Sequence, residues 1–361
     1  ADIRASPSLK RNLWRSGEVS SFHWRLDDTV RHFLKLPGCA IPVTSVQKLS
    51  RIILICRHAE RLAEFYIRAF GFTCIEDSPK SDPGFAELIG LANGQVRLTT
   101  LRLGNQVIAL AETQPPGCSY PRDVPGWDPR FQHFAIVVSD MTAAYAKLRA
   151  LHNWTAISTD GPQILPPSSG GVTAFKFRDP EGHPLEMLAF APDAMPAHWA
   201  IRSGNLFLGI DHSAISVADM SRSVAFYSRL GLARTASSLN VGREQEKLDN
   251  LRGVVVEVTA LAPPMQAVPH VELLCYRGNF DRRELLANRN DVAATQLAFE
   301  AERDALDAIV ALNRDTTILS PTTSERGGLR ALLRDPDGHL LCIESRTALP
   351  NSKSTNRHIA P

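Results

Sequence analysis

Two histidines and two glutamates of this chain stand in sequence contexts that suit metal binding or proton transfer. His133 and His212 each begin an apolar segment of strand length. Glu186 and Glu272 lie inside otherwise apolar segments, where a carboxylate is rarely buried without a partner. Imidazole and carboxylate groups together are suitable ligands for Zn²⁺, Ni²⁺, Mn²⁺ or Fe²⁺. Each of these side chains can equally be an ordinary hydrogen-bonded residue, so the elements that position them matter.

Sequence signatures of several other chemistries do not occur in the chain. It contains no P-loop, no GxGxxG after a strand-like segment, no GxSxG and no HExxH. Six cysteines are scattered without a CxxC pair, which favours reduced thiols and a cytoplasmic protein. Because the chain does not begin with Met, a removed signal peptide remains an alternative.

The composition is typical of a soluble globular protein. The chain has 361 residues, a net charge of +2, 44% hydrophobic residues and 22% charged residues. This length predicts two domains, and the near-neutral charge gives no indication of a nucleic acid or an anionic membrane as partner. The longest apolar runs, such as residues 134–138, are far shorter than the roughly 18 residues that a membrane helix needs.

Two segments of the chain repeat a strand, a turn and a helix. The sequence RIILICRHAERLAEFYIRAFGF begins at Arg51, and HSAISVADMSRSVAFYSRLGL begins at His212. Both contain a Phe-Tyr pair near the end of the expected helix, followed by a glycine. The apolar residues of the helical part recur with the period of an α-helix, and Asp219 stands where a side-chain oxygen can cap the second helix.

A second repeat predicts two β-hairpins. FKFRDPEGHPLEML begins at Phe175, and ALLRDPDGHLLCIE begins at Ala331. Each is read as a strand, a tight Asp-Pro-Glu/Asp-Gly turn and a returning strand, with Gly where a positive φ is required. The histidines of these turns, His183 and His339, recur in both copies, which favours a structural role for them.

The repeats predict four strand–helix–strands modules in two consecutive halves. Residues 1–47 are an N-terminal extension that does not fit the repeat, and residues 347–361 are a polar tail. The first two modules form a domain at 48–192 and the last two form a domain at 209–346, joined by a linker at 193–208. The modules start near the following residues: Arg51, His133, His212 and Gln296.

Four such modules, the Phe-Tyr pair and two DPxGH turns in register resemble the vicinal-oxygen-chelate superfamily. This superfamily includes glyoxalase I, bleomycin-resistance proteins and extradiol dioxygenases, and the resemblance covers roughly Lys48 to Ser345. It implies an α+β fold of four tandem βαβββ modules, paired into two halves with curved mixed sheets. It also implies that each curved sheet forms a cup, in which residues of the first and last strands of the paired modules hold a divalent metal.

In the first half, the resemblance places metal ligands at His133 and Glu186. Glu112 is the third candidate ligand there, and Glu186 and Glu112 are the candidate catalytic carboxylates. The first-strand ligand position falls on Arg51, which has no lone pair to offer a metal. Arg51 is therefore interpreted either as a clamp for a substrate anion or as a member of a salt bridge at the sheet edge.

In the second half, the resemblance places metal ligands at His212 and Glu272. Gln296 stands where the second histidine would be, and a Gln oxygen is an occasional ligand, so Gln296 completes the candidate set. Cys342 stands where the second glutamate would be and is interpreted as a small core residue. Glu344 lies two residues further along the same strand face and is a candidate substitute. We expect the first cup to bind metal more tightly than the second.

The resemblance implies a metal-dependent enzyme that acts on a small oxygenated substrate with glyoxalase-type lyase or isomerase chemistry. The cofactor is a divalent metal, either Zn, Ni, Mn or Fe, which acts as a Lewis acid. An extradiol-type ring-cleaving dioxygenase with Fe²⁺ is the second alternative, although neither half holds a complete His, His, Glu set. A non-catalytic small-molecule binding protein of the bleomycin-resistance type is the third. The expected partner is a small molecule, and the protein is either a monomer or a homodimer.

Overall fold

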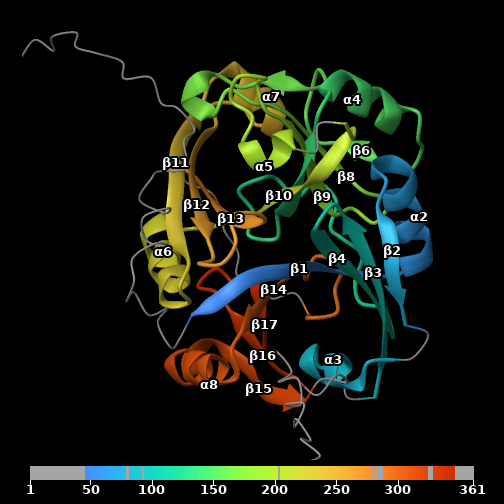
Figure 1. The fold of residues 1–361 in the computed structure, drawn as a ribbon, viewed down its shortest axis with the longest axis vertical. Helices are drawn as coiled ribbons and strands as arrows, with labels where there is room; N and C mark the ends of the chain where they lie inside the picture. Colours follow the sequence, from blue (N-terminus) through green and yellow to red (C-terminus); the bar gives the residue numbers. More distant parts are fainter. Residues whose placement is uncertain are drawn as a thin grey trace, which may run out of the picture.

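The structure is a computed structural model that describes residues 45–78, 81–91, 93–201, 204–278, 280, 288–323 and 328–345 (Figure 1). The side chains of residues 318–323 are not described. The predicted tail 347–361, and all but the last three residues of the predicted extension 1–47, lie outside the described residues.

The described elements follow the predicted order of four modules. Module 1 comprises β1 (Val46–Cys56), α2 (Ala59–Phe70), β2 (Thr73–Asp77), α3 (Pro83–Leu88), β3 (Gln95–Leu103) and β4 (Gln106–Gln114). Module 2 comprises β5 (Gln132–Val138), α4 (Met141–Arg149), β6 (Thr155–Ala156), β7 (Gln163–Ile164), the 3₁₀ helix η1 (Pro167–Ser169), β8 (Thr173–Arg178) and β9 (Pro184–Ala189).

The second half of the chain repeats this order after a short helix in the predicted linker, α5 (Ala197–Ala200). Module 3 comprises β10 (Phe207–Ser216), α6 (Met220–Arg229), β11 (Ala233–Val241), α7 (Arg243–Asp249), β12 (Val255–Ala262) and β13 (His270–Tyr276). Module 4 comprises β14 (Gln296–Ala301), α8 (Arg303–Leu312), the 3₁₀ helix η2 (Arg314–Thr316), β15 (Thr317–Thr323), β16 (Leu329–Arg334) and β17 (Leu340–Ser345).

The strands form two mixed, curved sheets, which confirms the predicted α+β fold, but the modules that share a sheet differ from the prediction. The eight-stranded sheet has the order β15-β16-β17-β14-β1-β4-β3-β2, so it joins modules 1 and 4. The nine-stranded sheet has the order β11-β12-β13-β10-β5-β9-β8-β6, with β7 also paired with β8, and joins modules 2 and 3. The expectation that modules 1 and 2 share one sheet, and modules 3 and 4 the other, is therefore wrong. The first strands pair instead with partners far along the chain, β1 with β14 and β5 with β10, both antiparallel.

Modules 1 and 2, and likewise modules 3 and 4, are joined by the repeated motifs rather than by strand pairing. In modules 1 and 2, the Tyr66 hydroxyl donates to Asp179, and Nε2 of His183 lies 3.0 Å from the carbonyl oxygen of Ile55. Modules 3 and 4 repeat this arrangement. The Tyr227 hydroxyl donates to Asp335 at 3.1 Å, and Nε2 of His339 lies 2.9 Å from the carbonyl oxygen of Ser216. The structural role predicted for the two DPxGH histidines is confirmed.

Local sequence signals explain the helix and turn geometry that surrounds these contacts. The side chain of Asp219 accepts a hydrogen bond from the backbone N–H of Arg222, which confirms the predicted cap of α6. Gly182 and Gly338 have φ values of 98° and 95° in the DPxGH turns, where a side chain would be strained. The helix-covered faces of both sheets share one large hydrophobic core that includes residues from all four modules.

The opposite, concave face of each sheet is a cup that is partly covered by a short helix. We call the concave face of the eight-stranded sheet cup A and that of the nine-stranded sheet cup B. Phe85 and Leu88 of α3 pack into an apolar cluster on cup A, and Leu248 of α7 packs onto cup B.

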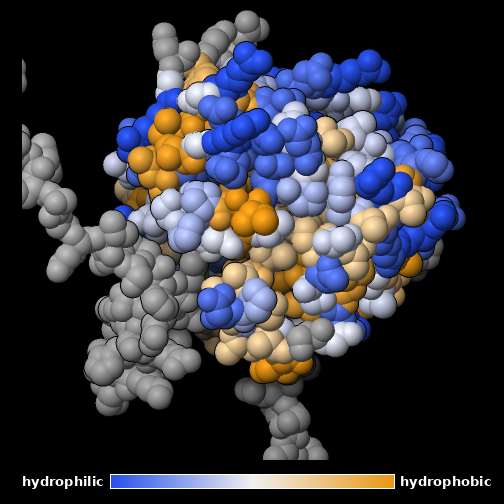
Figure 2. Space-filling view, turned by 90° about the horizontal axis from the view of Figure 1, so that it is seen from above, coloured by the Kyte–Doolittle hydropathy of each residue, from blue (hydrophilic) through white to orange (hydrophobic). Residues whose placement is uncertain are grey.

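Within the described residues, no helix combines the length and hydrophobicity needed to span a membrane. The molecular face in Figure 2 mixes polar residues with smaller apolar areas.

Candidate metal centre

The four residues highlighted first in the sequence meet in cup B. Strand register places Glu186 beside Ala135 and His212 beside that same alanine, so these positions form one row across β9, β5 and β10. A second row runs through residues paired side by side on β5, β10 and β13, namely His133, Ala214 and Glu272. The two small alanines lie between the polar side chains and leave space above the centre of the sheet.

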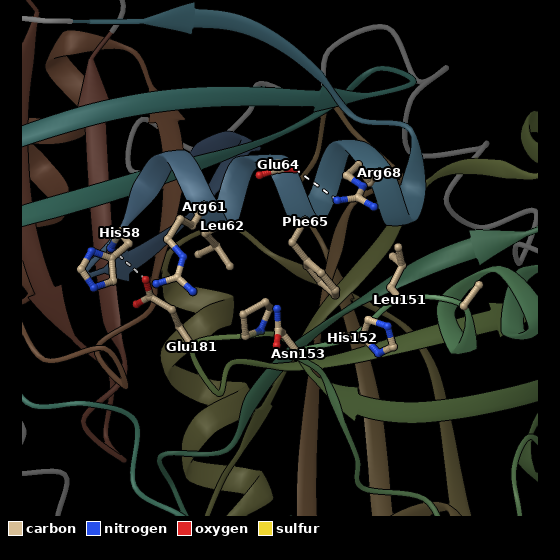
Figure 3. Close-up of a pocket in the computed structure, with 12 residues that line it drawn as sticks. His58, Arg61, Leu62, Glu64, Phe65, Arg68, Leu151, His152, Asn153 and Glu181 are labelled. Carbon is tan, nitrogen blue, oxygen red and sulfur yellow. Dashed lines mark hydrogen bonds and ion pairs between the residues drawn. The ribbon is translucent and has the colours of Figure 1, made fainter.

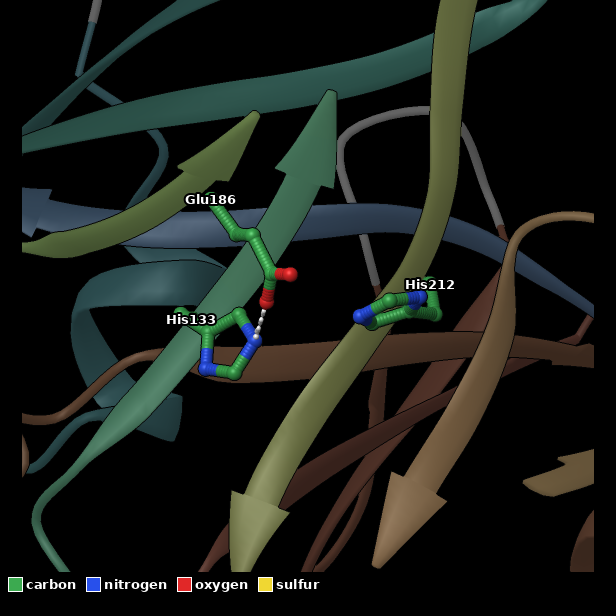
Figure 4. A group of neighbouring side chains, drawn as sticks. All are labelled: His133, Glu186 and His212. Carbon is green, nitrogen blue, oxygen red and sulfur yellow. Dashed lines mark ion pairs between the residues drawn. The ribbon is translucent and has the colours of Figure 1, made fainter. Parts of the chain in front are cut away.

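Short distances connect these side chains, and Figure 4 draws three of them, His133, Glu186 and His212. His133 Nε2 lies 2.9 Å from Glu186 Oε2, and His212 Nε2 lies 3.5 Å from Glu272 Oε2. The His133 and His212 ring centroids are 5.8 Å apart, and ligand atoms of His133, Glu186 and His212 lie within 4.8 Å of one another. All four residues are buried or nearly so. The centre is therefore built from modules 2 and 3. These modules belong to different halves of the sequence, so neither half contains the centre alone.

The electrostatics of cup B keep its carboxylates ionised. Burial alone would raise the pKa of Glu186, but His133 and Lys176 outweigh burial and lower that pKa to about 2. Burial alone would likewise lower the pKa of His212, but Glu272 and Asp211 raise it to about 9. Burial lowers the pKa of His133 despite its contact with Glu186. At neutral pH the proton on His212 thus supplies positive charge between the carboxylates.

Asp211 is a further candidate site residue that the sequence analysis did not single out. A register shift between Ile210 and His212 leaves Asp211 without its own partner on β5, and its carboxylate lies 3.1 Å from Nδ1 of His212. The indole N–H of Trp199 donates to the other carboxylate oxygen at 3.0 Å. A carboxylate at Nδ1 orients an imidazole and leaves Nε2 available to a metal. The Asp-His dipeptide was the only sequence signal, because the bulge depends on pairing with a distant strand.

Lys176 is a second buried charge in cup B that sequence analysis did not single out. It lies directly opposite Glu186 on β8, and its ammonium group is 2.6 Å from Asp249 at the end of α7. Asp249 also accepts hydrogen bonds from Gln245 Nε2 at 2.7 Å and the Tyr276 hydroxyl at 3.1 Å. Burial alone would lower the pKa of Lys176, but Asp249 and Glu186 raise it. This network fixes α7 over the cup.

Glu112 does not join His133 and Glu186, in contrast to the prediction. It lies at the end of β4 in the other sheet, where its carboxylate accepts a hydrogen bond of 2.7 Å from the backbone N–H of Ala59. Alignment of the strand registers shows why the prediction was wrong. In module 3, Glu272 pairs with Ala214, which is two residues after His212. In module 1, the residue two positions after Arg51 is Ile53, and it pairs with Ala109. Ala109, not Glu112, therefore occupies the last-strand ligand position.

The remaining predicted residues, Arg51, Gln296 and Cys342, occupy the ligand positions of cup A together with Ala109. Gln296 is therefore separated from His212 and Glu272, with which it was grouped in the sequence analysis. Arg51 forms an ion pair of 2.6 Å with Glu344, so of its two predicted roles the salt bridge is the one observed. Cys342 is fully buried in the apolar cluster of cup A, as expected for a core residue.

The donor set of cup B fits a divalent metal. Nε2 of His133, of His212 and of His270 are all buried, and none makes a well-directed hydrogen bond. Buried polar atoms without partners are uncommon in native proteins and need an explanation. Two ionised carboxylates and several imidazole nitrogens without well-directed hydrogen bonds lie close together in cup B, and such groups are the ligands preferred by Zn²⁺, Ni²⁺, Fe²⁺ and related ions. Cup A offers no comparable set, because its corresponding residues are an arginine, an alanine, an amide and a buried thiol.

A groove on the outer surface is a poorer candidate for the functional site. It encloses about 270 Å³ between α2 and the segment that follows α4, and Phe65 and Leu151 lie in its wall (Figure 3). Its carboxylates already have partners. Glu181 accepts hydrogen bonds from two backbone N–H groups, and Glu64 pairs with Arg68 at 3.2 Å. Nothing in the groove resembles the convergence of unpartnered donors in cup B.

Comparison with known families agrees with the fold and the repeats. The model of the Glyoxalase/Bleomycin resistance protein/Dioxygenase superfamily matches residues 48–187 and again residues 209–343, which is most of the chain. The protein belongs to this superfamily. As in other members of the vicinal-oxygen-chelate superfamily, the modules are βαβββ units, here with a short additional helix after the second strand of modules 1 and 3.

Solved structures of this superfamily show the same fold at low sequence identity. Glyoxalase I from Zea mays has a TM-score of 0.55 and 14% identity, covering 88% of this chain and 95% of that chain. A putative dioxygenase from Bacillus subtilis has a TM-score of 0.50 and 12% identity, covering 84% of this chain and 87% of that chain. No curated protein sequence matches at a significant level. At these identities the likeness concerns the fold, and the activity has to be argued from cup B.

Proposed function

We propose that this protein is a metal-dependent enzyme of the superfamily with one catalytic site, located in cup B. The observation that carries the proposal is the convergence of His133, Glu186, His212 and Glu272 from modules 2 and 3, which belong to different halves of the chain. Two buried carboxylates at this point favour glyoxalase-type lyase or isomerase chemistry on a small oxygenated substrate. A divalent metal held there would act as a Lewis acid towards substrate oxygens.

Within this proposal, the two carboxylates have different environments. The ammonium group of Lys176 stabilises the anion of Glu186, which makes Glu186 a weak proton acceptor. Glu272 faces His212 and His270 instead, and these imidazoles are the largest causes that lower its pKa. We therefore assign the proton-transfer role to Glu272 in place of Glu186, the catalytic residue expected from the sequence, and we assign Glu186 to metal binding.

A ring-cleaving dioxygenase is the second candidate, and one observation favours it. His133 and His212 share cup B, so a His, His, Glu set is present within a single cup although neither sequence half contains it. Two histidines and one carboxylate form the iron site of many oxygenases. The additional carboxylate in cup B keeps the lyase or isomerase proposal first.

Metal analysis of protein purified without added metal tests the proposal and separates the candidates. We expect about one equivalent of zinc, nickel or manganese, together with isomerase activity on a thiol adduct of a 2-oxoaldehyde. One equivalent of iron, with oxygen consumption on catechols, would favour the dioxygenase. Failure to bind any divalent metal, including on titration, would overturn the proposal and leave a non-catalytic binding protein.

A further inference from the structure

A third imidazole, that of His270, lies beside the candidate ligands of cup B. It is on the last strand of module 3, but at a position to which the family resemblance assigns no ligand. His270 is two residues before Glu272 on β13, so both side chains point to the same face of the sheet. Its Cα position is paired with that of His212 on the neighbouring strand, and the two ring centroids are 5.5 Å apart. His270 is therefore held in the same row as an existing candidate ligand.

The Nε2 atom of His270 lies beside Glu272 and has no competing hydrogen bond. This nitrogen is buried without a hydrogen-bond partner and lies 3.5 Å from Glu272 Oε1. The other oxygen of Glu272 lies at the same distance, 3.5 Å, from Nε2 of His212. Ligand atoms of Asp211, His212 and His270 also lie within 4.8 Å of one another. One carboxylate thus stands between the Nε2 atoms of two imidazoles, neither of which makes a well-directed hydrogen bond.

The fold itself does not require a histidine at this position. The two halves of cup B are related repeats, in which Glu186 corresponds to Glu272 and His133 to His212. Two residues before Glu186, the position that corresponds to His270 is Pro184, which has no side-chain donor. His270 therefore makes the centre asymmetric by adding a nitrogen donor on the module 3 side only.

We propose that His270 is an additional metal ligand, so that the centre contains three imidazoles and two carboxylates. This inference rests on the proposed function, because it concerns the same metal. More nitrogen donors favour ions such as Fe²⁺, Co²⁺, Ni²⁺ and Zn²⁺ over Mn²⁺ or Mg²⁺, which prefer oxygen ligands. The site accordingly binds Co²⁺ or Zn²⁺ more tightly than Mn²⁺, and His270 contributes much of that preference.

Proton NMR of the Co²⁺-loaded protein tests this count directly. Each histidine bound to Co²⁺ through Nε2 gives one exchangeable, strongly shifted Nδ1–H signal. We expect three such signals in the wild type, two in His270→Ala and three in His152→Ala, an exposed histidine of the outer groove that serves as the control. We also expect His270→Ala to lower Co²⁺ affinity by roughly 100-fold, more than it lowers Mn²⁺ affinity.

The outcomes separate this inference from the proposed function. Two signals in the wild type, unchanged in His270→Ala, would overturn the assignment of His270 while metal binding itself stands. Absence of any bound Co²⁺ in the wild type would overturn the proposed function and, with it, this inference. The wild-type spectrum decides the count even if His270→Ala fails to fold, and His270→Gln, which keeps an oxygen donor, is expected to show two signals with an intermediate affinity.

Discussion

The two cups of this protein have nearly the same backbone but opposite interiors. The four ligand positions of cup B carry two histidines and two glutamates, whereas the corresponding positions of cup A carry Gln296, Cys342, Arg51 and Ala109. Cup A is filled by an apolar cluster that includes residues of α3. One frame of βαβββ modules therefore accommodates either a polar centre or an ordinary hydrophobic core, and side chains at a few equivalent positions decide which one forms.

Charge in cup A is neutralised internally, without any need for a metal. Arg51 pairs with Glu344 at 2.6 Å, and Arg330 pairs with Glu344 at 2.9 Å and with Asp82 at 2.7 Å. Two arginines and two carboxylates thus form a chain across β1, β17, β16 and the start of α3. In cup B the cations that face the carboxylates are Lys176 and those imidazoles that carry a proton. The difference supports the proposal that cup B, and not cup A, binds a divalent metal.

The sharpest test of this comparison removes ligands from each cup in turn. We expect His133→Ala with Glu186→Ala, and His212→Ala with Glu272→Ala, to weaken metal binding to the same extent, each by more than roughly 100-fold, because the residues share one centre. Calorimetric titration of Zn²⁺ or Co²⁺ measures the effect. Gln296→Leu and Cys342→Ala in cup A are the matched controls and should bind like the wild type. Loss of binding in only one of the two double variants would show that the centre is not shared.

The next largest effect concerns the buried ion pair over cup B. Lys176→Met leaves Asp249 buried without its cation, and we expect it to lower the free energy of unfolding by about 3–5 kcal/mol. Urea denaturation measures the change. In Lys176→Met with Asp249→Asn the cost should be smaller than the sum of the two single variants. The more exposed pair Lys48–Glu300 is the control, since Lys48→Met should cost less than about 1 kcal/mol. Equal costs for the two lysines would contradict the burial argument.

A substitution in cup A should have the opposite sign. The side-chain amide of Gln296 is fully buried, and neither its oxygen nor its nitrogen has a hydrogen-bond partner. Gln296→Leu removes two unsatisfied polar atoms from an apolar environment, so we expect it to raise the free energy of unfolding by about 1–3 kcal/mol. Thermal and urea unfolding at neutral pH measure the shift. Destabilisation by this variant would mean that the amide has a bound partner and that cup A is not simply a core.

The smallest predicted effect is a proton linkage that belongs to cup B. Because the pKa of His212 is raised to about 9, this imidazole carries a proton at neutral pH and must lose it before it binds a metal. We expect metal uptake at pH 7 to release about one proton, and apparent affinity to rise roughly tenfold per pH unit until pH approaches about 9. Calorimetry in buffers of different ionisation enthalpy counts the proton. No proton release at pH 7 would show that His212 is neutral in the metal-free protein.

The sequence by itself determined the modules and the local contacts of this protein. The helix period, the Phe-Tyr pairs and the DPxGH turns each act over short distances along the chain, and the structure has them where the repeats predicted. The sequence also identified His133, Glu186, His212 and Glu272, because polar residues in apolar strands are conspicuous in any context.

Only the tertiary structure decided which of these residues meet. The four modules have similar first strands, so local patterns cannot distinguish pairing of β1 with β5 from pairing of β1 with β14, and that choice determines the content of each cup. Strand register similarly placed Ala109 instead of Glu112 at a ligand position, and a bulge turned Asp211 towards His212. These features depend on hydrogen bonds between strands that are distant in the sequence, and a shift of one residue moves a side chain to the opposite face of the sheet.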